Sequence, residues 1–276
     1  MNKIIVTALF LMLSFTQVDA QYYYKDILTN RDLLTTMQRY KENKIKNVSI
    51  ESFEADGLPS DGFICTRKIS KDFKTVTLFT RSNMVAPSLF ISRFNEDGTL
   101  SSTYDSSDIS VTAIQYTYDN EKRVQSIQSR IHSTDDDFTN EIKEEHLYIY
   151  ENNKVPVKMI RIRNLTDSTL ILFANDEHGN LGIEKDTRSG TKYYYYYDSK
   201  NRLTSVVQEN DFKIRPVPDY IFQYNNQDNI TQMIVTAEGG NNYVTWKYGY
   251  ENGLRIWEKC YGKDKRLVGS IEYHYK

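Results

Sequence analysis

The amino-acid sequence predicts an all-β protein: an antiparallel meander of repeated hairpins, curled or barrel-like, with one short N-terminal helix. Three observations support this prediction. A turn motif recurs along most of the chain, aromatic residues alternate before each copy of the motif, and Tyr, which favours strands, occurs 22 times in 276 residues. A supersecondary unit that recurs at a fixed length defines an architecture before any single residue is interpreted.

Residues 1–20 are typical of a secretory signal peptide. Lys3 supplies a positive charge, an apolar run follows it, and Ala20 ends a small-residue cleavage site. The apolar run is too short to span a membrane securely, which favours a cleaved leader over a retained anchor helix. We therefore expect an exported protein that begins at Gln21 and resides in the periplasm, on the cell surface or in the medium. No linker rich in Pro or Ser divides residues 21–276, so a single domain is predicted.

The mature chain is predicted to open with a helix over about residues 30–43. Residues 29–32 resemble a capping box, which marks the start of a helix. Apolar residues then recur at helical spacing, at Leu33, Leu34, Met37 and Tyr40. We expect this helix to plug or cover one end of the sheet. Strands are predicted to follow at residues 48–53, 63–70 and 75–81.

The rest of the sequence repeats one unit: an aromatic strand end, a short acidic or Asn-rich turn, and an apolar residue. The copies of equal length span residues 94–100, 118–124, 197–203 and 224–230. The aromatic residue before the turn, the anchor, recurs every 22 to 32 residues when the altered copies at Tyr150, Asn175 and Tyr250 are included. This interval fits one hairpin per repeat and about 15–18 strands in all. It places the turns at Asn120, Ser199 and Asn226 on one rim.

The residues two and four positions before each anchor share one face of a strand with it. They are mostly aromatic, so one face of every second strand is predicted to be an aromatic column that stabilises the sheet. Such columns contain Tyr193, Tyr195 and Tyr197; Tyr220, Phe222 and Tyr224; and Trp246, Tyr248 and Tyr250. After the turn, apolar residues recur at a spacing of three, as in Val124 and Ile127. A β-bulge or a late strand start would explain this spacing.

These residues resemble the YD repeat of secreted bacterial proteins, a unit also found in Rhs-type and teneurin shells. The resemblance covers roughly residues 89–276 and is strongest at Tyr118 and Tyr197. Most copies lack the Gly that is usual in this turn. Two copies have it, at Gly98 and Gly179. The copies are too few for a large closed shell, and the chain is more similar to secreted Bacteroidetes families of uncharacterised proteins with YD-like repeats and a porin-like fold. This resemblance implies a broad meander, open or closed into a barrel, and implies no activity.

Composition and motifs argue against several functional classes. The 35 basic and 37 acidic residues nearly cancel and form no basic stripe, so nucleic acid is not an expected partner. The four His residues lack metal-ligand spacing, and the sequence contains neither a nucleophile elbow nor a phosphate-binding Gly loop. We therefore expect no metal, no cofactor and no catalysis. A pair of glycosidase carboxylates would need a geometry that sequence does not reveal.

The two cysteines, Cys65 and Cys260, lie far apart in the sequence. An exported chain permits a disulfide between them, and two separate buried thiols are the alternative. Bridged Cα atoms lie within about 7 Å of each other. A Cys65–Cys260 bridge would therefore require that an early and a late strand meet, as they do in a closed barrel.

The sequence thus predicts an exported soluble binding or scaffold protein of the bacterial envelope, without catalysis. An outer-membrane β-barrel is the first alternative, and a glycan-acting enzyme with an unrecognised site is the second. Candidate ligand-binding residues are Tyr194 and Tyr196, which alternate with the aromatic column and so point away from it, together with Trp257 and the acidic Asp136. Their partner would be a glycan, a peptide or an envelope protein. Burial of Tyr194 and Tyr196 by the helix or the opposite wall is the competing interpretation.

Overall fold

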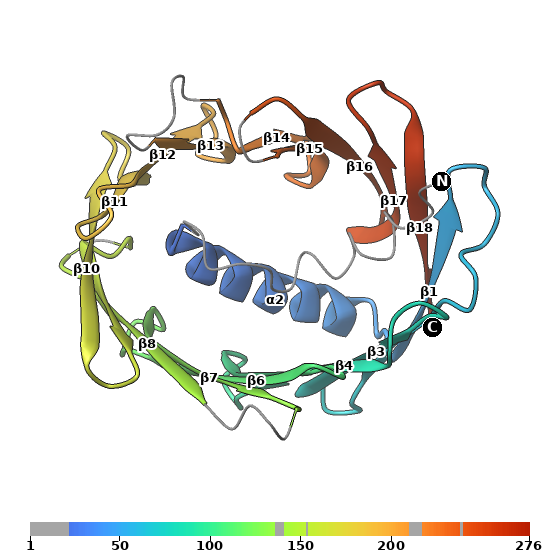
Figure 1. Cartoon of the computed structure of the whole chain (residues 1–276), viewed down its shortest axis with the longest axis horizontal. Helices are drawn as coiled ribbons and strands as arrows, with labels where there is room; N and C mark the ends of the chain where they lie inside the picture. The colour runs from blue at the N-terminus through green and yellow to red at the C-terminus, as the bar shows by residue number, and fades with distance from the viewer. Residues whose placement is uncertain (1–21, 136–140, 153, 210–216, 238–239) are drawn as a thin grey trace.

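The computed structural model is a closed β-barrel with a helix in its lumen (Figure 1). It describes residues 22–135, 141–152, 154–209, 217–237 and 240–276. The predicted signal peptide and Asp136 lie outside the described residues. Among the described residues, no helix is both long and apolar enough to cross a membrane.

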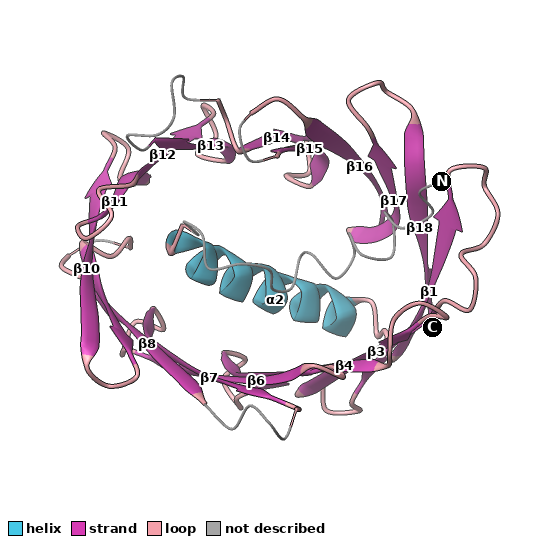
Figure 2. Cartoon of the chain, in the orientation of Figure 1, coloured by secondary structure: helices cyan, strands magenta, loops and turns pink. Residues whose placement is uncertain are grey.

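In the part of the chain that the structure describes, the barrel wall is a single sheet of 18 strands. The strands are β1 (Asn47–Glu54), β2 (Ile64–Ile69), β3 (Thr75–Arg81), β4 (Ser88–Phe94), β5 (Leu100–Ser106), β6 (Ser110–Tyr118), β7 (Val124–Ser133), β8 (Ile142–Ile149), β9 (Lys158–Arg163), β10 (Asp167–Asn175), β11 (Leu181–Asp186), β12 (Lys192–Tyr197), β13 (Leu203–Glu209), β14 (Tyr220–Tyr224), β15 (Ile230–Thr236), β16 (Tyr243–Glu251), β17 (Leu254–Tyr261) and β18 (Leu267–Tyr275). Figure 2 shows that strands and the loops and turns between them make up the described residues outside α2.

Each strand pairs antiparallel with its neighbours in the sequence, and β1 pairs with β18 to close the ring. The closing register runs from Val48 opposite Tyr275 to Glu54 opposite Gly269. Closure pairs every one of these strands on both sides, so the described wall has no open edge that could aggregate with another chain. The predicted all-β meander is confirmed, and its 18 strands lie within the predicted range. The sequence left open whether the sheet closes, and the structure shows that it does.

The helix α2 (Tyr24–Glu42) starts earlier than predicted. The proposed capping box at residues 29–32 is wrong, because those residues lie inside the helix. The actual cap comes from the wall: the backbone N–H groups of Tyr23 and Tyr24 donate to the carboxylate of Glu184 on β11, at 2.7 and 3.0 Å. These N–H groups have no acceptor within the helix, and a distant carboxylate satisfies them. The helix lies across the lumen (Figure 1), so it plugs the barrel.

The turns of the repeat lie on one rim, as predicted. Those at residues 118–124, 197–203 and 224–230 each join an even-numbered strand to the next odd-numbered one, and in a closed antiparallel meander such connections share a rim. The pairing register also shifts at the anchors, for example between Thr117 and Tyr118. This β-bulge adds one residue to the strand that follows the turn and explains the spacing of three between buried apolar residues.

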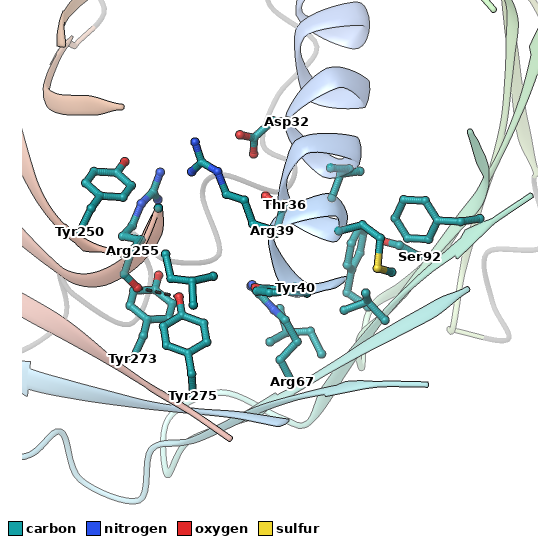
Figure 3. A pocket seen from close by; sticks show the side chains of 18 residues that line it. Asp32, Thr36, Arg39, Tyr40, Arg67, Ser92, Tyr250, Arg255, Tyr273 and Tyr275 are labelled. Carbon is teal, nitrogen blue, oxygen red and sulfur yellow. Dashed lines mark hydrogen bonds between the residues drawn. The ribbon is translucent and has the colours of Figure 1, made fainter. Parts of the chain in front are cut away.

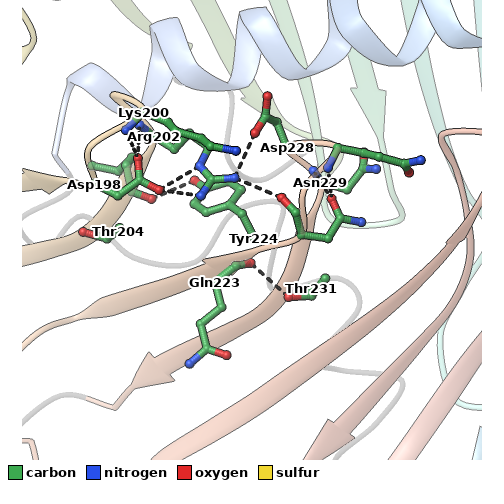
Figure 4. Close-up of polar contacts among 12 residues, drawn as sticks. Asp198, Lys200, Arg202, Thr204, Gln223, Tyr224, Asp228, Asn229 and Thr231 are labelled. Carbon is green, nitrogen blue, oxygen red and sulfur yellow. Dashed lines mark hydrogen bonds and ion pairs between the residues drawn. The ribbon is translucent and has the colours of Figure 1, made fainter.

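The repeated turn is held by its own polar side chains (Figure 4). Asp198 Oδ1 accepts the backbone N–H groups of Lys200 and Arg202 at 2.9 and 3.0 Å. Asn201 adopts a φ of 59°, in the left-handed region, which explains why a Gly suits this position. The Arg202 guanidinium pairs with Asp198 and lies 4.8 Å from the ring centre of Tyr224 in the next hairpin. The repeat therefore joins neighbouring hairpins as well as closing each one.

The disulfide allowed by the sequence is not formed, since Cys65 and Cys260 are both free and buried. The ring does bring early and late strands together, but β18 and β1 lie between the strands of the two cysteines. Three strand spacings of about 4.8 Å place the two backbones roughly 14 Å apart, too far for a bridge. Backbone pairing of β1 with β18 closes the barrel instead.

Candidate functional site in the barrel lumen

The aromatic columns line the lumen and enclose the helix. Tyr193 and Tyr195 are each 4% exposed, and Tyr195 packs edge-on against Tyr24 of α2 with ring centres 5.7 Å apart. Tyr196 alternates with them, faces outward and is 53% exposed, while Tyr194 is half-buried on the same outer face. The predicted orientation of Tyr194 and Tyr196 away from the column is confirmed. Their role in binding stays a prediction.

Trp257 does not join Tyr194 and Tyr196 in one surface. It also faces outward, but four strands lie between β12 and β17. Its ring is packed on the backbone of Gly249, where the Cβ of any larger residue would lie only 2.1 Å from Trp257 Nε1. Gly249 thus provides the room for this ring, and the Lys259 ammonium lies 5.4 Å from the ring centre. Trp257 is therefore part of the wall packing in a separate region of the outer face.

A cavity of about 240 Å³ lies in the lumen beside the C-terminal half of α2 (Figure 3). Three arginines from separate elements line it: Arg39 from α2, Arg67 from β2 and Arg255 from β17. Tyrosines surround them, and residues of β3, β4 and the β16–β17 turn complete the wall. The tyrosines are Tyr40, Tyr250, Tyr273 and Tyr275. Asp32, on the exposed side of the helix, is the one carboxylate among the described lining residues.

Arg255 is held by the wall and keeps one donor unused. Its guanidinium pairs with the buried Glu258 at 2.9 Å, and the Tyr273 hydroxyl donates to the same carboxylate. Its Nε is buried and has no hydrogen-bond partner among the described residues. Burial opposes the positive charge, but the Glu258 carboxylate outweighs it and holds the pKa of Arg255 well above its ordinary value.

Arg39 and Arg67 form no ion pair with any described residue. Arg67 donates to the Tyr40 hydroxyl. Arg39 donates to the Asn229 side-chain oxygen at 2.8 Å, which ties α2 to the β14–β15 turn. The cavity therefore holds more guanidinium donors than described protein acceptors. Such an excess suits an anion, because a guanidinium presents a planar fork of donors to carboxylate or phosphate oxygens.

A second polar cluster lies at the other end of the helix. His146 on β8 bridges two carboxylates, with Nδ1 2.6 Å from Asp26 of α2 and Nε2 2.8 Å from Glu144. Burial opposes its charge, yet the two carboxylates raise the pKa of His146 to about 9. For Glu184, burial is the larger effect and raises the pKa to about 7. The hydrogen bonds that its carboxylate accepts from the wall and the helix lower the pKa but do not outweigh burial. His146 pairs with Asp26 of the helix, and Glu184 accepts the N–H groups at the helix start, so both groups fix the helix N-terminus to the wall.

Neither lumenal group could be recognised in the sequence, because the members of each group come from distant segments. One signal was present in the sequence. In β2, Cys65, Arg67 and Ile69 occupy alternate positions, and Cys65 and Ile69 are buried. A charged residue on the buried face of a strand needs a partner or a ligand. His146 gave the same signal within an aromatic column.

Comparisons with known proteins give fold likeness only. No protein-family model and no curated protein matches the sequence. Among solved structures, a porin-like protein from Bacteroides uniformis is similar with a TM-score of 0.38 and 9% identity, covering 84% of this chain and 98% of that chain. The TcdB2–TccC3 complex is similar with a TM-score of 0.34 and 14% identity, covering 84% of this chain and 14% of that chain. A protein from Bacteroides fragilis, described as exported and with a YmcC-like fold, has a TM-score of 0.26 and 8% identity, covering 83% and 94%. These scores lie below 0.5, so no functional argument rests on them.

Proposed function

We propose that the chain is an exported barrel of the bacterial envelope that binds or scaffolds a partner outside the lipid bilayer, without catalysis. One observation supports this proposal above the others. Most of the buried residues are aromatic or apolar and pack in the lumen around α2, beside the polar groups described above, while the outer face carries charged side chains such as Lys247 and Glu51. A transmembrane barrel has the opposite arrangement, with an apolar belt facing lipid and a polar interior.

The outer charges lie in the middle of paired strands. Lys247 on β16 stands opposite Lys259 on β17, and Glu51 on β1 stands opposite Glu272 on β18. These residues alternate with buried ones such as Trp246, Cys260 and Ile50, so they point away from the lumen. A Lys facing lipid near the bilayer midplane costs about 2–4 kcal/mol. A continuous lipid belt over β16, β17, β18 and β1 is therefore disfavoured.

The opposite arc of the barrel is more apolar on its outer face. Leu170 and Leu172 on β10, Ile183 on β11 and Tyr196 on β12 are all exposed there. This arc covers only part of the circumference, whereas a membrane span requires a complete belt. Exposed apolar and aromatic surface on a soluble protein marks a contact site. We propose Tyr194 and Tyr196 within this arc as contact residues for a glycan, a peptide or an envelope protein.

Fractionation of the native envelope tests this proposal. We expect the protein in the soluble fraction or, if peripherally attached, released by an alkaline carbonate wash, and in the aqueous phase after detergent phase separation. A resident outer-membrane porin in the same preparation serves as the control that stays in the membrane. Retention of the protein with that porin, together with heat-dependent migration in electrophoresis, would establish the outer-membrane alternative and overturn the proposal.

Export makes a separate prediction about the N-terminus. Mass spectrometry of the protein isolated from its native host should find Gln21, open or cyclised, as the first residue, because Ala20 ends the predicted cleavage site. Peptides that cover Lys3 should be missing from the mature protein and present in cells in which the export machinery is blocked. An intact Met1 on the mature protein contradicts the prediction.

A further inference from the structure

We propose that the lumenal cavity binds a small organic anion, of about monosaccharide size, whose carboxylate or phosphate is held by Arg39, Arg67 and Arg255. This inference rests on the binding role proposed above and names the ligand class for a site in the lumen. It concerns a different surface from the outer Tyr194 and Tyr196.

The first support is the balance of charge around the cavity. Three arginines line it, and the carboxylates nearby are Glu258, which pairs with Arg255, and Asp32, on the exposed side of the helix. No described carboxylate pairs with Arg39 or Arg67. Arg39 and Arg67 are half-buried, and a cationic side chain withdrawn from water is normally paired. The unused donor on Arg255 Nε is the clearest sign of this excess, because it is buried and has no described partner. An anion would supply the missing acceptors.

The second support is that the guanidinium groups are held in place before any ligand arrives. Arg67 is fixed by the Tyr40 hydroxyl, Arg39 by Asn229, and Arg255 by Glu258. Each contact uses only part of the donors of its guanidinium, which has five N–H groups in a fixed fork. A ligand would then bind to side chains that have already lost most of their rotamer freedom, and such preorganisation favours affinity.

The third support is the shape and chemistry of the rest of the wall. A volume of about 240 Å³ exceeds the space of a single water or inorganic ion and approaches the lower range of small-molecule sites. Tyr273 and Tyr275 stack with ring centres 6.4 Å apart, and Phe90 and Phe94 line the other side. Aromatic faces and hydroxyls beside arginines suit a compact ligand with a polar ring and one anionic group. A polymer would not fit in this space.

Calorimetric titration of the purified, full-length mature protein tests the inference. The probes are glucuronate, phosphorylated glucose and inorganic phosphate, with uncharged glucose as the neutral match in size. We expect at least one of the two sugar anions to bind with a dissociation constant below the millimolar range and at least tenfold more tightly than glucose. The affinity should fall as salt is added, because the attraction is electrostatic. Whether glucuronate or the phosphorylated sugar binds more tightly distinguishes the two anion types, while binding of inorganic phosphate alone would overturn the organic-ligand claim.

Variants locate the site. Arg39→Met and Arg67→Met should each weaken binding at least tenfold, and Arg255→Lys, which keeps the charge but loses Nε, should weaken it as well. Arg130→Met is the matched control, because Arg130 is exposed on the outer face of β7; it should leave binding unchanged. A thermal melt confirms that each variant is folded, and Arg39→Gln replaces Arg39→Met if the latter unfolds. Binding by the Arg39 and Arg67 variants equal to the wild type, or no binding of either sugar anion to the folded protein, overturns the inference.

The two proposals fail separately. A protein that can be extracted only with detergent refutes the proposed location outside the bilayer, and the same titration in detergent still decides whether the lumen takes an anion. A soluble, folded protein that binds neither sugar anion refutes the lumenal site and does not affect the proposed location outside the bilayer.

Discussion

Replacement of Tyr195 with Ala is expected to lower the free energy of unfolding by about 3–5 kcal/mol, the range for truncating a large aromatic side chain in a core. Tyr195 is 4% exposed and packs against Tyr22 and Tyr24 near the start of the helix. Its hydroxyl also donates to Glu184 at 2.7 Å. The variant therefore leaves a cavity between wall and helix and removes one of the donors that hold the buried carboxylate.

The neighbouring Tyr196→Ala variant is the matched control, because it removes the same side chain from the same strand. Tyr196 is 53% exposed on the outer face, so its loss should change stability by no more than about 0.5 kcal/mol. Chemical denaturation of both variants measures the difference. Equal losses would show that the alternation of lumenal and outer faces along β12 is misassigned. A loss of partner capture by Tyr196→Ala with unchanged stability would support its proposed contact role.

The pH dependence of stability should be dominated by the polar cluster at the helix N-terminus. The pKa of Glu184 is raised from 4.5 to about 7 and that of His146 from 6.5 to about 9. In both cases the folded state holds its proton more tightly than the unfolded state. The stability linked to Glu184 is therefore complete below pH 4.5 and is lost as the pH rises through 7. The contribution of His146 is complete below pH 6.5 and is lost as the pH rises through 9.

Stability should thus decline from mildly acidic to alkaline pH by several kcal/mol, since each pKa unit corresponds to about 1.4 kcal/mol. Glu144 has the opposite sign: hydrogen bonds from His146 and Arg161 overcome burial and lower its pKa from 4.5 to about 2, so its contribution is complete above pH 4.5 and is lost as the pH falls through 2. Unfolding by denaturant at a series of pH values measures the profile. Glu184→Gln should remove the decline in stability between pH 4.5 and about 7. His146→Gln should remove the decline between pH 6.5 and about 9.

The control for this series is His178→Gln, because the His178 side chain lies in a turn and is 65% exposed. This variant should reproduce the wild-type profile. A wild-type protein whose stability stays constant between mildly acidic and alkaline pH would contradict the assignment of buried, proton-retaining groups to the helix N-terminus. The same result would remove the basis for treating Glu184 as a desolvated cap.

The features that the sequence predicted correctly are those encoded locally. A strand reveals its two faces by alternation, so the lumenal column at Tyr193 and Tyr195 and the outward direction of Tyr196 follow from neighbouring residues. The turn at Asp198 is likewise built from contacts within five residues, which is why its repeats and their shared rim could be recognised. Even the β-bulge was visible as an irregular spacing of apolar residues.

The features that could not be predicted depend on which segments the ring brings together. The helix begins at Tyr24 because Glu184, 160 positions away, accepts its first N–H groups. The capping-box pattern at residues 29–32 matches the local rule for a helix start, but those residues lie inside α2. The cavity depends on Arg39, Arg67 and Arg255, which only a folded barrel places around one space. Closure of the ring alone does not determine the distance between Cys65 and Cys260. That distance depends on the number of strands between them, which the sequence did not reveal.

Closure between β1 and β18 has a consequence for how the chain acquires its structure. Each hairpin along the wall forms from residues close in sequence, and such contacts cost little loop entropy. The closing pair instead joins residues such as Val48 and Tyr275, which are separated by most of the chain. Contacts of this kind raise the contact order and slow folding. Because α2 and β1 precede every other described element in the chain, they gain their full set of neighbours only when β18 pairs with β1, and enclosure of the helix becomes one of the final events of folding.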